Sequence, residues 1–284
     1  MSEAPREESS PPSPPAIRAT APIAINGDRL AGNIVLYGIL FEIFLVLLDA
    51  TINYGRWIDI GPIRRLCNIA REDGLASWFM AAQTLMAGVT LGFLFVVSRH
   101  RTEARRSARG WGLLALFFIY MAADDGAEIH ERIGSAFKAI VRAAPQEEGS
   151  ASLGARILDF FPSYPWQFIL LPIFATIGVL MLIFLWRTLK PAASRSILVL
   201  AMGCFVAAVG LDFVEGLDPD HPWNLAEMLS DRWVHDSGAV RHFSKSLEEF
   251  LEMVGMTLLW SLFVRHLTCL PGDSLHLALS SQPE

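Results

Sequence analysis

The chain has 284 residues, of which 52% are hydrophobic and only 18% are charged. This composition is too apolar for a soluble domain of such length and is typical of a multi-pass membrane protein. The formal net charge of −6 offers no basic surface, which excludes nucleic acid as a partner.

The N-terminal region, residues 1–30, is polar and rich in proline, with the run Pro11-Pro12-Ser13-Pro14-Pro15. It lacks the basic start and the short apolar core of a signal peptide. We therefore expect a disordered cytoplasmic tail over 1–30. A second cytoplasmic tail is expected over 269–284.

Six stretches are long enough to cross the hydrocarbon core of a bilayer, which takes about 20 helical residues. They cover residues 33–54, 76–98, 111–133, 166–187, 196–216 and 246–265. The predicted fold is all-α, a six-transmembrane helix bundle that occupies residues 31–268.

The distribution of basic residues predicts the orientation of this bundle, because short cytoplasmic loops are enriched in Arg and Lys. The connection 99–109 is the most basic segment, and the next short connection carries Arg187, Lys190 and Arg195. Both are expected in the cytoplasm, together with the N and C termini, and the membrane is expected to be a bacterial inner membrane. The first outer connection also carries four arginines, so the bias is moderate.

Acidic residues end two of the predicted spans and begin the last one. Carboxylates at membrane depth are costly and mark a functional site by default. At 1.5 Å per residue, four helices each place one carboxylate roughly 20 to 24 Å from the cytoplasmic side. The candidate site residues are Asp49, Glu72, Asp124, Asp125, Glu128, His130, Glu131, Asp212, Glu215, Glu249 and Glu252.

Some of these residues have an ordinary structural interpretation as well. Glu249 is also the fourth residue of a possible capping box that starts at Ser246. Asp124 and Asp212 lie near helix C-termini, where the helix dipole disfavours negative charge, so a functional role is favoured for them. His130 faces away from the acidic stripe unless the helix bends at Gly126. Glu42 lies near the middle of the membrane, where a protonated acid hydrogen-bonded between helices is an alternative to a functional group.

So many carboxylates cannot all be ionised in a low dielectric without protons or cations to compensate them. A bound divalent metal is the more economical explanation. Oxygen-rich ligands suit Mg, Ca or Mn, and a histidine ligand adds Fe or Zn. In the last outer connection, His221, His235 and His242 are best interpreted as ordinary loop histidines, although His242 is placed to cover the site.

The third span, with Asp124-Asp125 followed by Ile129-His130-Glu131, resembles a motif of uncharacterised multi-pass bacterial membrane proteins. The segment 68–79 and the motif Glu248-Glu249-x-x-Glu252-Met253 are similar to two further segments of that group. The resemblance implies one constellation formed by Glu72, Asp124, Asp125, His130, Glu131, Glu215, Glu249 and Glu252. This chain departs from the pattern with Ala122 in place of Ser and Asp125 in place of Glu. The resemblance implies a site and no particular reaction.

Three functions remain open. The first is a metal-dependent membrane enzyme that acts on a lipid-like substrate at an outward-facing site. The second is a cation or proton transporter, which requires a site near the membrane midplane and a polar route to the cytoplasm. The third is a non-catalytic accessory or structural subunit.

Overall fold

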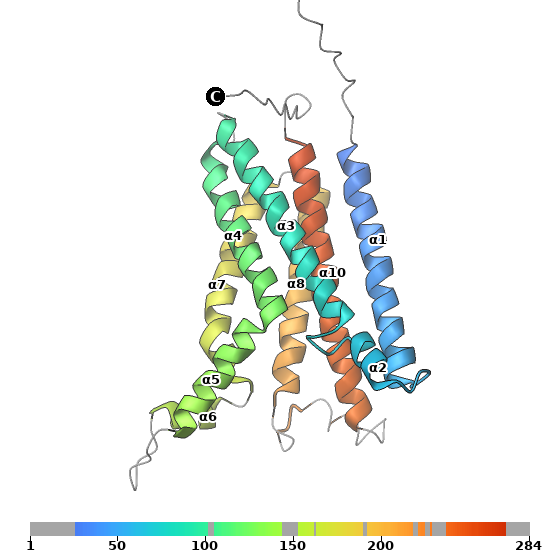
Figure 1. The fold of residues 1–284 in the computed structure, drawn as a ribbon. Coiled ribbons are helices and arrows are strands. Elements are labelled where there is room, and N and C mark those ends of the chain that lie inside the picture. Colours follow the sequence, from blue (N-terminus) through green and yellow to red (C-terminus); the bar gives the residue numbers. More distant parts are fainter. Residues whose placement is uncertain are drawn as a thin grey trace, which may run out of the picture. The chain divides into compact units, whose positions relative to one another are not determined.

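In the part of the chain that the computed structural model describes, every regular element is a helix (Figure 1). The described residues are 26–101, 105–143, 153–161, 163–189, 192–217, 221–224, 228 and 237–270. Most of the two expected tails, 1–30 and 269–284, lies outside them. The exceptions are residue 26, residues 27–30, which belong to the first helix and are not disordered as expected, and residues 269–270 after the last helix.

Four helices are long and apolar enough to cross a membrane. They are α1 Gly27–Leu48 with its π-helical extension η1 Asp49–Tyr54, α3 Leu75–His100, α7 Pro165–Thr188 and α8 Ala192–Glu215. Two others, α4 Arg105–Ala127 and α10 Ser237–Thr268, are as long but carry more charged residues. The described part of this membrane protein is thus all-helical, and the count of six spans stays a prediction.

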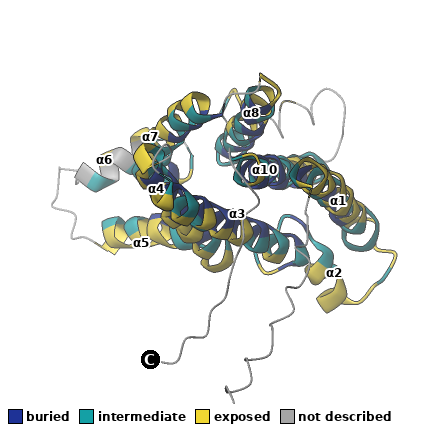
Figure 2. Ribbon diagram, turned by 90° about the horizontal axis from the view of Figure 1, so that it is seen from above, coloured by how far each residue is buried: buried dark blue, intermediate teal, exposed yellow. Residues whose placement is uncertain are grey.

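The long helices pack around α10. It contacts α8, α1 and α3, while α3 pairs closely with α4 along its length (Figure 2). The sequence supports these close approaches: Gly255 of α10 faces Phe205 of α8, and Gly88 of α3 faces the backbone of Ile119. Large side chains that are fully buried in this core are Leu91, Leu94, Trp111, Leu185, Leu198, Leu259, Leu262 and Phe263.

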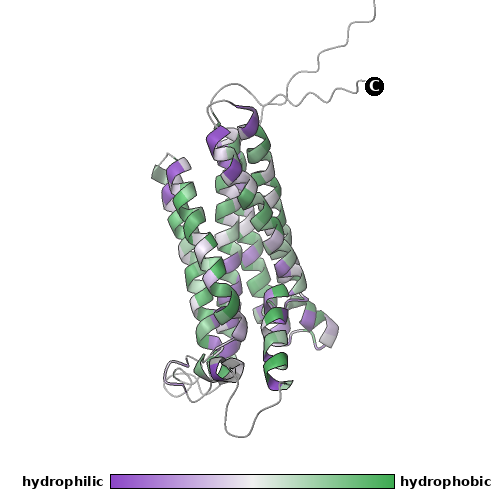
Figure 3. Cartoon of the chain, turned by 90° about the vertical axis from the view of Figure 1, so that its left-hand side faces the viewer, coloured by the Kyte–Doolittle hydropathy of each residue, from purple (hydrophilic) through white to green (hydrophobic). Residues whose placement is uncertain are grey.

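Apolar side chains cover the outer faces of α1 and α7, where few residues are buried. In α7 only Gln167, Met181 and Leu185 are buried, although the helix has 24 residues. Figure 3 shows hydrophobic residues along most of the helix lengths. Exposed leucine, isoleucine and phenylalanine on such faces are stable against lipid chains, as expected for membrane-spanning helices.

Two helix boundaries differ from the prediction and both affect the site. The third predicted span, 111–133, is broken: α4 ends at Ala127, Glu128 has φ +53°, and α5 Ile129–Ala143 begins in a new direction. The last helix begins at Ser237, nine residues before the predicted start. Ser246 is therefore inside α10 and cannot cap it. The short helices α2 Gly61–Cys67 and α6 Leu153–Phe160 complete the described elements.

Candidate functional site

The acidic residues of α10 surround a lysine that precedes them on the same helix. Lys245 Nζ lies 2.7 Å from Glu248 Oε1 and 3.6 Å from Glu249 Oε1. It also lies 3.9 Å from Asp212 Oδ1 of α8. The side chains of Lys245 and Glu248 are 22% and 4% exposed, so this is a largely buried ion-pair network. A buried charge needs a partner, and Lys245 supplies one to three carboxylates.

A residue of α7 hydrogen-bonds to an acid that α8 contributes to the site. Gln167 Nε2 donates a hydrogen bond of 2.8 Å to Asp212 Oδ2, and both residues are buried. Glu215, one turn further along α8, lies within electrostatic range of Asp212, Lys245 and Arg241. Its Oε2 atom is buried and has no hydrogen-bond partner. Glu215 is therefore close to two basic residues, while one of its carboxylate oxygens has no hydrogen bond.

The break after α4 brings His130 back onto Asp124. The backbone N–H of His130 donates to Asp124 Oδ1 at 2.8 Å, and its ring Nδ1 lies 2.9 Å from Oδ2. The imidazole also packs edge-on against Trp166, with ring centroids 4.7 Å apart. Asp124, which is 1% exposed, thus acts as the cap of α5 and fixes the ring of His130. The predicted span 111–133 had no break; the bend that His130 needs in order to reach the acids is present, and it occurs at Glu128 and not at Gly126.

The remaining acids lie between the group around Lys245 and the pair formed by Asp124 and His130. Thr84 of α3 donates to Asp125 Oδ2 at 3.1 Å. Asp125 and Glu252 lie within electrostatic range of each other, and Glu131 lies within range of Asp212, Glu215 and Glu249. We use the name acidic cluster for Glu72, Asp125, Glu131, Asp212, Glu215, Glu248, Glu249 and Glu252 with Lys245 and His130.

Glu72 belongs to the loop before α3 and faces α5. Burial, together with the charges of Glu131 and Glu128 nearby, raises the pKa of Glu72 from 4.5 to about 8. One of its oxygens, Oε2, is buried without a partner. Its neighbour Asp73 is different, because hydrogen bonds from Arg71 and Arg65 hold the pKa of Asp73 well below its ordinary value. Of these two adjacent acids, only Glu72 is part of the acidic cluster.

Asp49 lies apart from this cluster, in a second polar centre between η1 and α10. Its carboxylate lies 2.8 Å from His242 Nε2 and accepts from Ser246 Oγ at 3.0 Å. It also accepts from Asn53 Nδ2 at 2.9 Å and from the backbone N–H of Ile69 at 3.3 Å. Four donors leave Asp49 little capacity for a further ligand. We conclude that it fixes η1 to α10.

The structure brings together most of the predicted site residues. Glu128 is on the edge, where it pairs with the exposed Arg132 at 3.3 Å. His242 binds Asp49 and does not cover the cluster, while His235 lies outside the described residues. Among the residues that the structure describes, no three His, Cys, Asp or Glu side chains are arranged as a metal centre. Oxygen atoms that could serve as metal ligands are present, because the Oε2 atoms of Glu72, Glu215 and Glu248 are buried without hydrogen-bond partners.

Sequence reasoning missed the polar residues that support the acids, above all Lys245, Gln167 and Thr84. A signal for Lys245 was available: it stands three and four residues before Glu248 and Glu249, the spacing of ion pairs on one helix face. It was assigned to a loop because the helix was expected to begin at Ser246. Gln167 and Thr84 are single polar residues in apolar helices, and nothing in the sequence alone indicates which helices they face.

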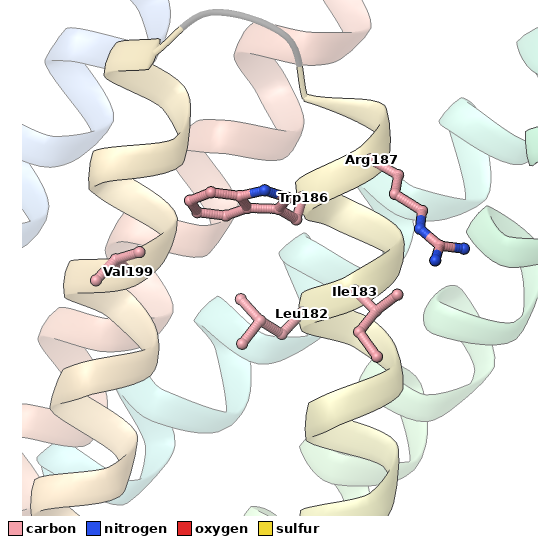
Figure 4. A pocket seen from close by; sticks show the side chains of 5 residues that line it. All are labelled: Leu182, Ile183, Trp186, Arg187 and Val199. Atoms are coloured by element: carbon pink, nitrogen blue, oxygen red, sulfur yellow. The ribbon is translucent and has the colours of Figure 1, made fainter.

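A shallow pocket lies between α7 and α8, toward the ends of these helices that are opposite to Gln167 and Asp212. Leu182, Ile183, Trp186, Arg187 and Val199 line it (Figure 4). Its volume is about 470 Å³ and its lining is almost entirely apolar. It contains no acid or histidine among these residues, so it is separate from the acidic cluster and has the character of a lipid-facing groove.

Comparison with known proteins identifies one family. The chain belongs to the family described as Domain of unknown function (DUF8692), whose model matches residues 38–267. No curated protein and no solved structure matches the chain. The matched region extends from the middle of α1 almost to the end of α10, and it therefore includes every residue of the acidic cluster.

Proposed function

For this member of the family, we propose that the acidic cluster binds a divalent cation and serves a metal-dependent membrane enzyme that acts on a lipid-like substrate. The observation that carries the proposal is an imbalance of charge. Of the eight carboxylates, Asp212 and Glu248 are buried, five are half-buried and Glu131 is exposed. They have one half-buried lysine and one histidine among them, and that histidine already pairs with Asp124. Ions that are removed from water without compensation are unstable. A divalent cation supplies the missing positive charge most economically.

The unpartnered oxygens of Glu215 and Glu248 support this proposal. Each of the two carboxylates belongs to the group around Lys245, and each has one buried oxygen that no donor occupies. Carboxylate oxygens are the ligands that Mg, Mn and Ca prefer, and His130 extends the choice to Fe or Zn. Because the side chains are not arranged as a metal centre in the described residues, cation binding requires rotation of these carboxylates toward each other.

The surroundings of the cluster support a lipid-like substrate. It lies where α4 gives way to α5, an amphipathic helix of 15 residues that packs against α7 through Gly134 and Trp166. Ile133 and Ile140 of α5 are exposed. An amphipathic helix with exposed apolar residues suits the membrane interface, where lipid headgroups meet the acyl chains. A metal ion placed there is positioned to polarise a carbonyl or phosphoryl group or to activate water.

The enzyme proposal is tested by incubating the purified protein with lipid extract in nanodiscs, with Mn²⁺, Mg²⁺ or Zn²⁺ or with a chelator. Mass spectrometry then compares the lipids before and after. We expect a metal-dependent change in one lipid class that is absent with Glu248→Gln and retained with the exposed-residue control Asp59→Asn. An unchanged lipid profile with a protein that binds metal stoichiometrically would reject the enzymatic role and keep the metal site.

A second candidate function, cation or proton transport, is favoured by one observation. Thr84, which binds Asp125 of the cluster, is the neighbour of Gln83, which binds Glu42 in the interior of the bundle. Two adjacent polar residues of α3 therefore contact the acidic cluster and Glu42 at nearly the same height of the helix. Flux of Mn²⁺ or protons into proteoliposomes, abolished by Asp125→Asn, would favour transport over catalysis.

A further inference from the structure

A third polar centre, separate from the acidic cluster and from Asp49 and its partners, is buried in the bundle where α1, α3 and α10 meet. Gln83 Nε2 donates to Glu42 Oε1 at 3.1 Å, and Thr257 Oγ1 donates to the same oxygen at 2.5 Å. Gln83 Nε2 also donates to Thr257 Oγ1. Glu42 and Thr257 are 0% exposed and Gln83 is 3% exposed. Three helices thus contribute one polar side chain each to a centre closed to solvent.

The packing around this centre is close. Gly38, one turn before Glu42 in α1, stands against Thr257, and a Cβ at Gly38 would lie 2.8 Å from the threonine hydroxyl oxygen. The glycine lets α1 approach α10 near enough for Glu42 to reach its partners. In α1 only three residues are buried, and Glu42 is one of them. A carboxylic acid is therefore the main polar contact that α1 makes with the core.

The hydrogen-bond pattern leaves two acceptors without a donor. Glu42 Oε1 receives both bonds, whereas Glu42 Oε2 and Gln83 Oε1 are buried and have no partner. An unsatisfied buried acceptor is costly, and two of them on side chains that already touch call for one shared explanation. No lysine, arginine or histidine among the described residues forms an ion pair with Glu42.

The groups that face Glu42 from each neighbouring helix leave its charge uncompensated. From α3 and α10 it meets the neutral Gln83 and Thr257, and Cys204 of α8 lies within electrostatic range of it. An ionised carboxylate with neutral partners in the middle of a membrane is strongly unfavourable. A single positive charge resolves both this problem and the missing donors.

We propose that Glu42 and Gln83 form a proton-binding site, in which one exchangeable proton on Glu42 Oε2 is shared with Gln83 Oε1. The acid and the amide then make two parallel hydrogen bonds, one from Gln83 Nε2 to Glu42 Oε1 and one from Glu42 Oε2 to Gln83 Oε1. A proton needs no additional space, which fits the closed packing at Gly38. A sodium ion on the same two oxygens is the competing occupant, and the test below distinguishes it.

This site contains no residue of the acidic cluster and does not depend on a metal there. It gives the bundle an exchangeable proton in addition to the proposed cation. Buried acids inside membrane helices commonly act as proton relays. Gln83 and Thr84 place the Glu42 site and Asp125 on adjacent residues of one helix. The Glu42 site and Asp125 thus contact the same turn of α3.

Infrared difference spectroscopy of the full chain in nanodiscs near neutral pH tests the proposal. We expect a carbonyl stretch of a protonated carboxylic acid that disappears in Glu42→Gln and shifts in D₂O, because the proton exchanges. Gln83→Met should keep the band but move it to higher frequency, since the acid loses its amide partner. Glu128→Gln is the matched control, because Glu128 lies on the exposed edge, and it should leave this band unchanged.

Two results would overturn the proposal. If neither Glu42→Gln nor Gln83→Met alters any protonated-acid band, Glu42 is not protonated. If Na⁺ raises the unfolding temperature relative to choline in the wild type but not in Glu42→Gln, the occupant is a metal ion and not a proton. If Glu42→Gln fails to fold, the frequency shift in Gln83→Met and in Thr257→Val decides the question, and an unshifted band in both rejects the site.

Discussion

Lys245 Nζ lies 2.7 Å from Glu248 Oε1 and 3.9 Å from Asp212 Oδ1, so one cation connects α10 with α8 inside the bundle. This relationship explains how so many acids fold together: part of their charge is offset by a residue of the chain itself. The same contact also shows which acids of the cluster Lys245 does not pair with. Glu215, Glu252 and Asp125 have no lysine or arginine bonded to them in the described structure, and they are the acids for which a bound cation matters most.

Replacing Lys245 by Met tests its role as the internal cation. The variant leaves Asp212, Glu248 and Glu249 uncompensated, and removal of one partner from a buried ion pair costs about 3 to 5 kcal/mol. We expect a loss of this size in the unfolding free energy measured by SDS titration in detergent, with part of the loss restored by added Mn²⁺. Lys138→Met, at an exposed position of α5, is the control and should change little. A loss below about 1 kcal/mol would show that Lys245 is not the main counter-ion.

Glu72 gives the stability of the protein a defined dependence on pH. Its pKa is raised from 4.5 to about 8 by burial and by Glu131 and Glu128, so folding favours its protonated form. The corresponding stability is complete below pH 4.5 and is lost as the pH rises through about 8. We expect the unfolding temperature of the wild type to fall across this interval more steeply than that of Glu72→Gln. Parallel curves for the two proteins would contradict the assignment, and the exposed Asp59→Asn should follow the wild type.

Glu128 is strained by its left-handed backbone. A non-glycine residue at φ +53° costs about 1 to 2 kcal/mol, and its ion pair with the exposed Arg132 contributes little in return. Glu128→Gly should therefore be more stable than the wild type by roughly 0.5 to 1 kcal/mol. Lys138→Gly in the interior of α5 should instead be less stable by about 1 kcal/mol. Destabilisation of equal size at both positions would mean that the helix break does not strain Glu128.

Asp49 and His242 should behave as a structural pair that is separate from the cation site. Asp49→Asn and His242→Gln each remove a charge-assisted contact between η1 and α10, and we expect a loss of about 2 to 3 kcal/mol for each. The double variant should show an interaction energy of about 1 to 2 kcal/mol, measured by SDS titration. Additive effects would mean that the 2.8 Å contact is unimportant. Metal binding should be unchanged in Asp49→Asn.

The helical membrane fold was predictable because hydropathy over about 20 residues is a strong local signal. α1, α3, α7 and α8 lie close to the predicted spans, although α1 begins at Gly27 and not at residue 33. The break at Glu128 was not predicted, because it depends on Asp124 capping α5, a contact between residues six apart that no periodicity encodes. The early start of α10 was missed because residues 237–245 are polar and were interpreted as a loop.

The sequence predicts which acids belong to the candidate site, and their role as one site stays a prediction. Acids in apolar helices are visible in any sequence, and in the structure Glu131 lies within electrostatic range of Asp212, as Asp125 does of Glu252. Asp49 was grouped with them because it lies at a similar depth. Depth along a helix does not determine direction, and Asp49 faces His242 and Ser246 instead. The partners of the acids come from other helices, so only the packed structure identifies them.

The most direct measurement is the metal content of detergent-purified protein, determined by elemental analysis for the wild type, Glu215→Gln, Glu248→Gln and Glu252→Gln, with Asp49→Asn as the folded control. We predict about one or two equivalents of a single divalent metal in the wild type and in Asp49→Asn, and loss of this metal in the other three variants. Folded wild-type protein that contains no metal and takes up none when Mg²⁺, Mn²⁺, Ca²⁺, Fe²⁺ or Zn²⁺ is added would contradict the account.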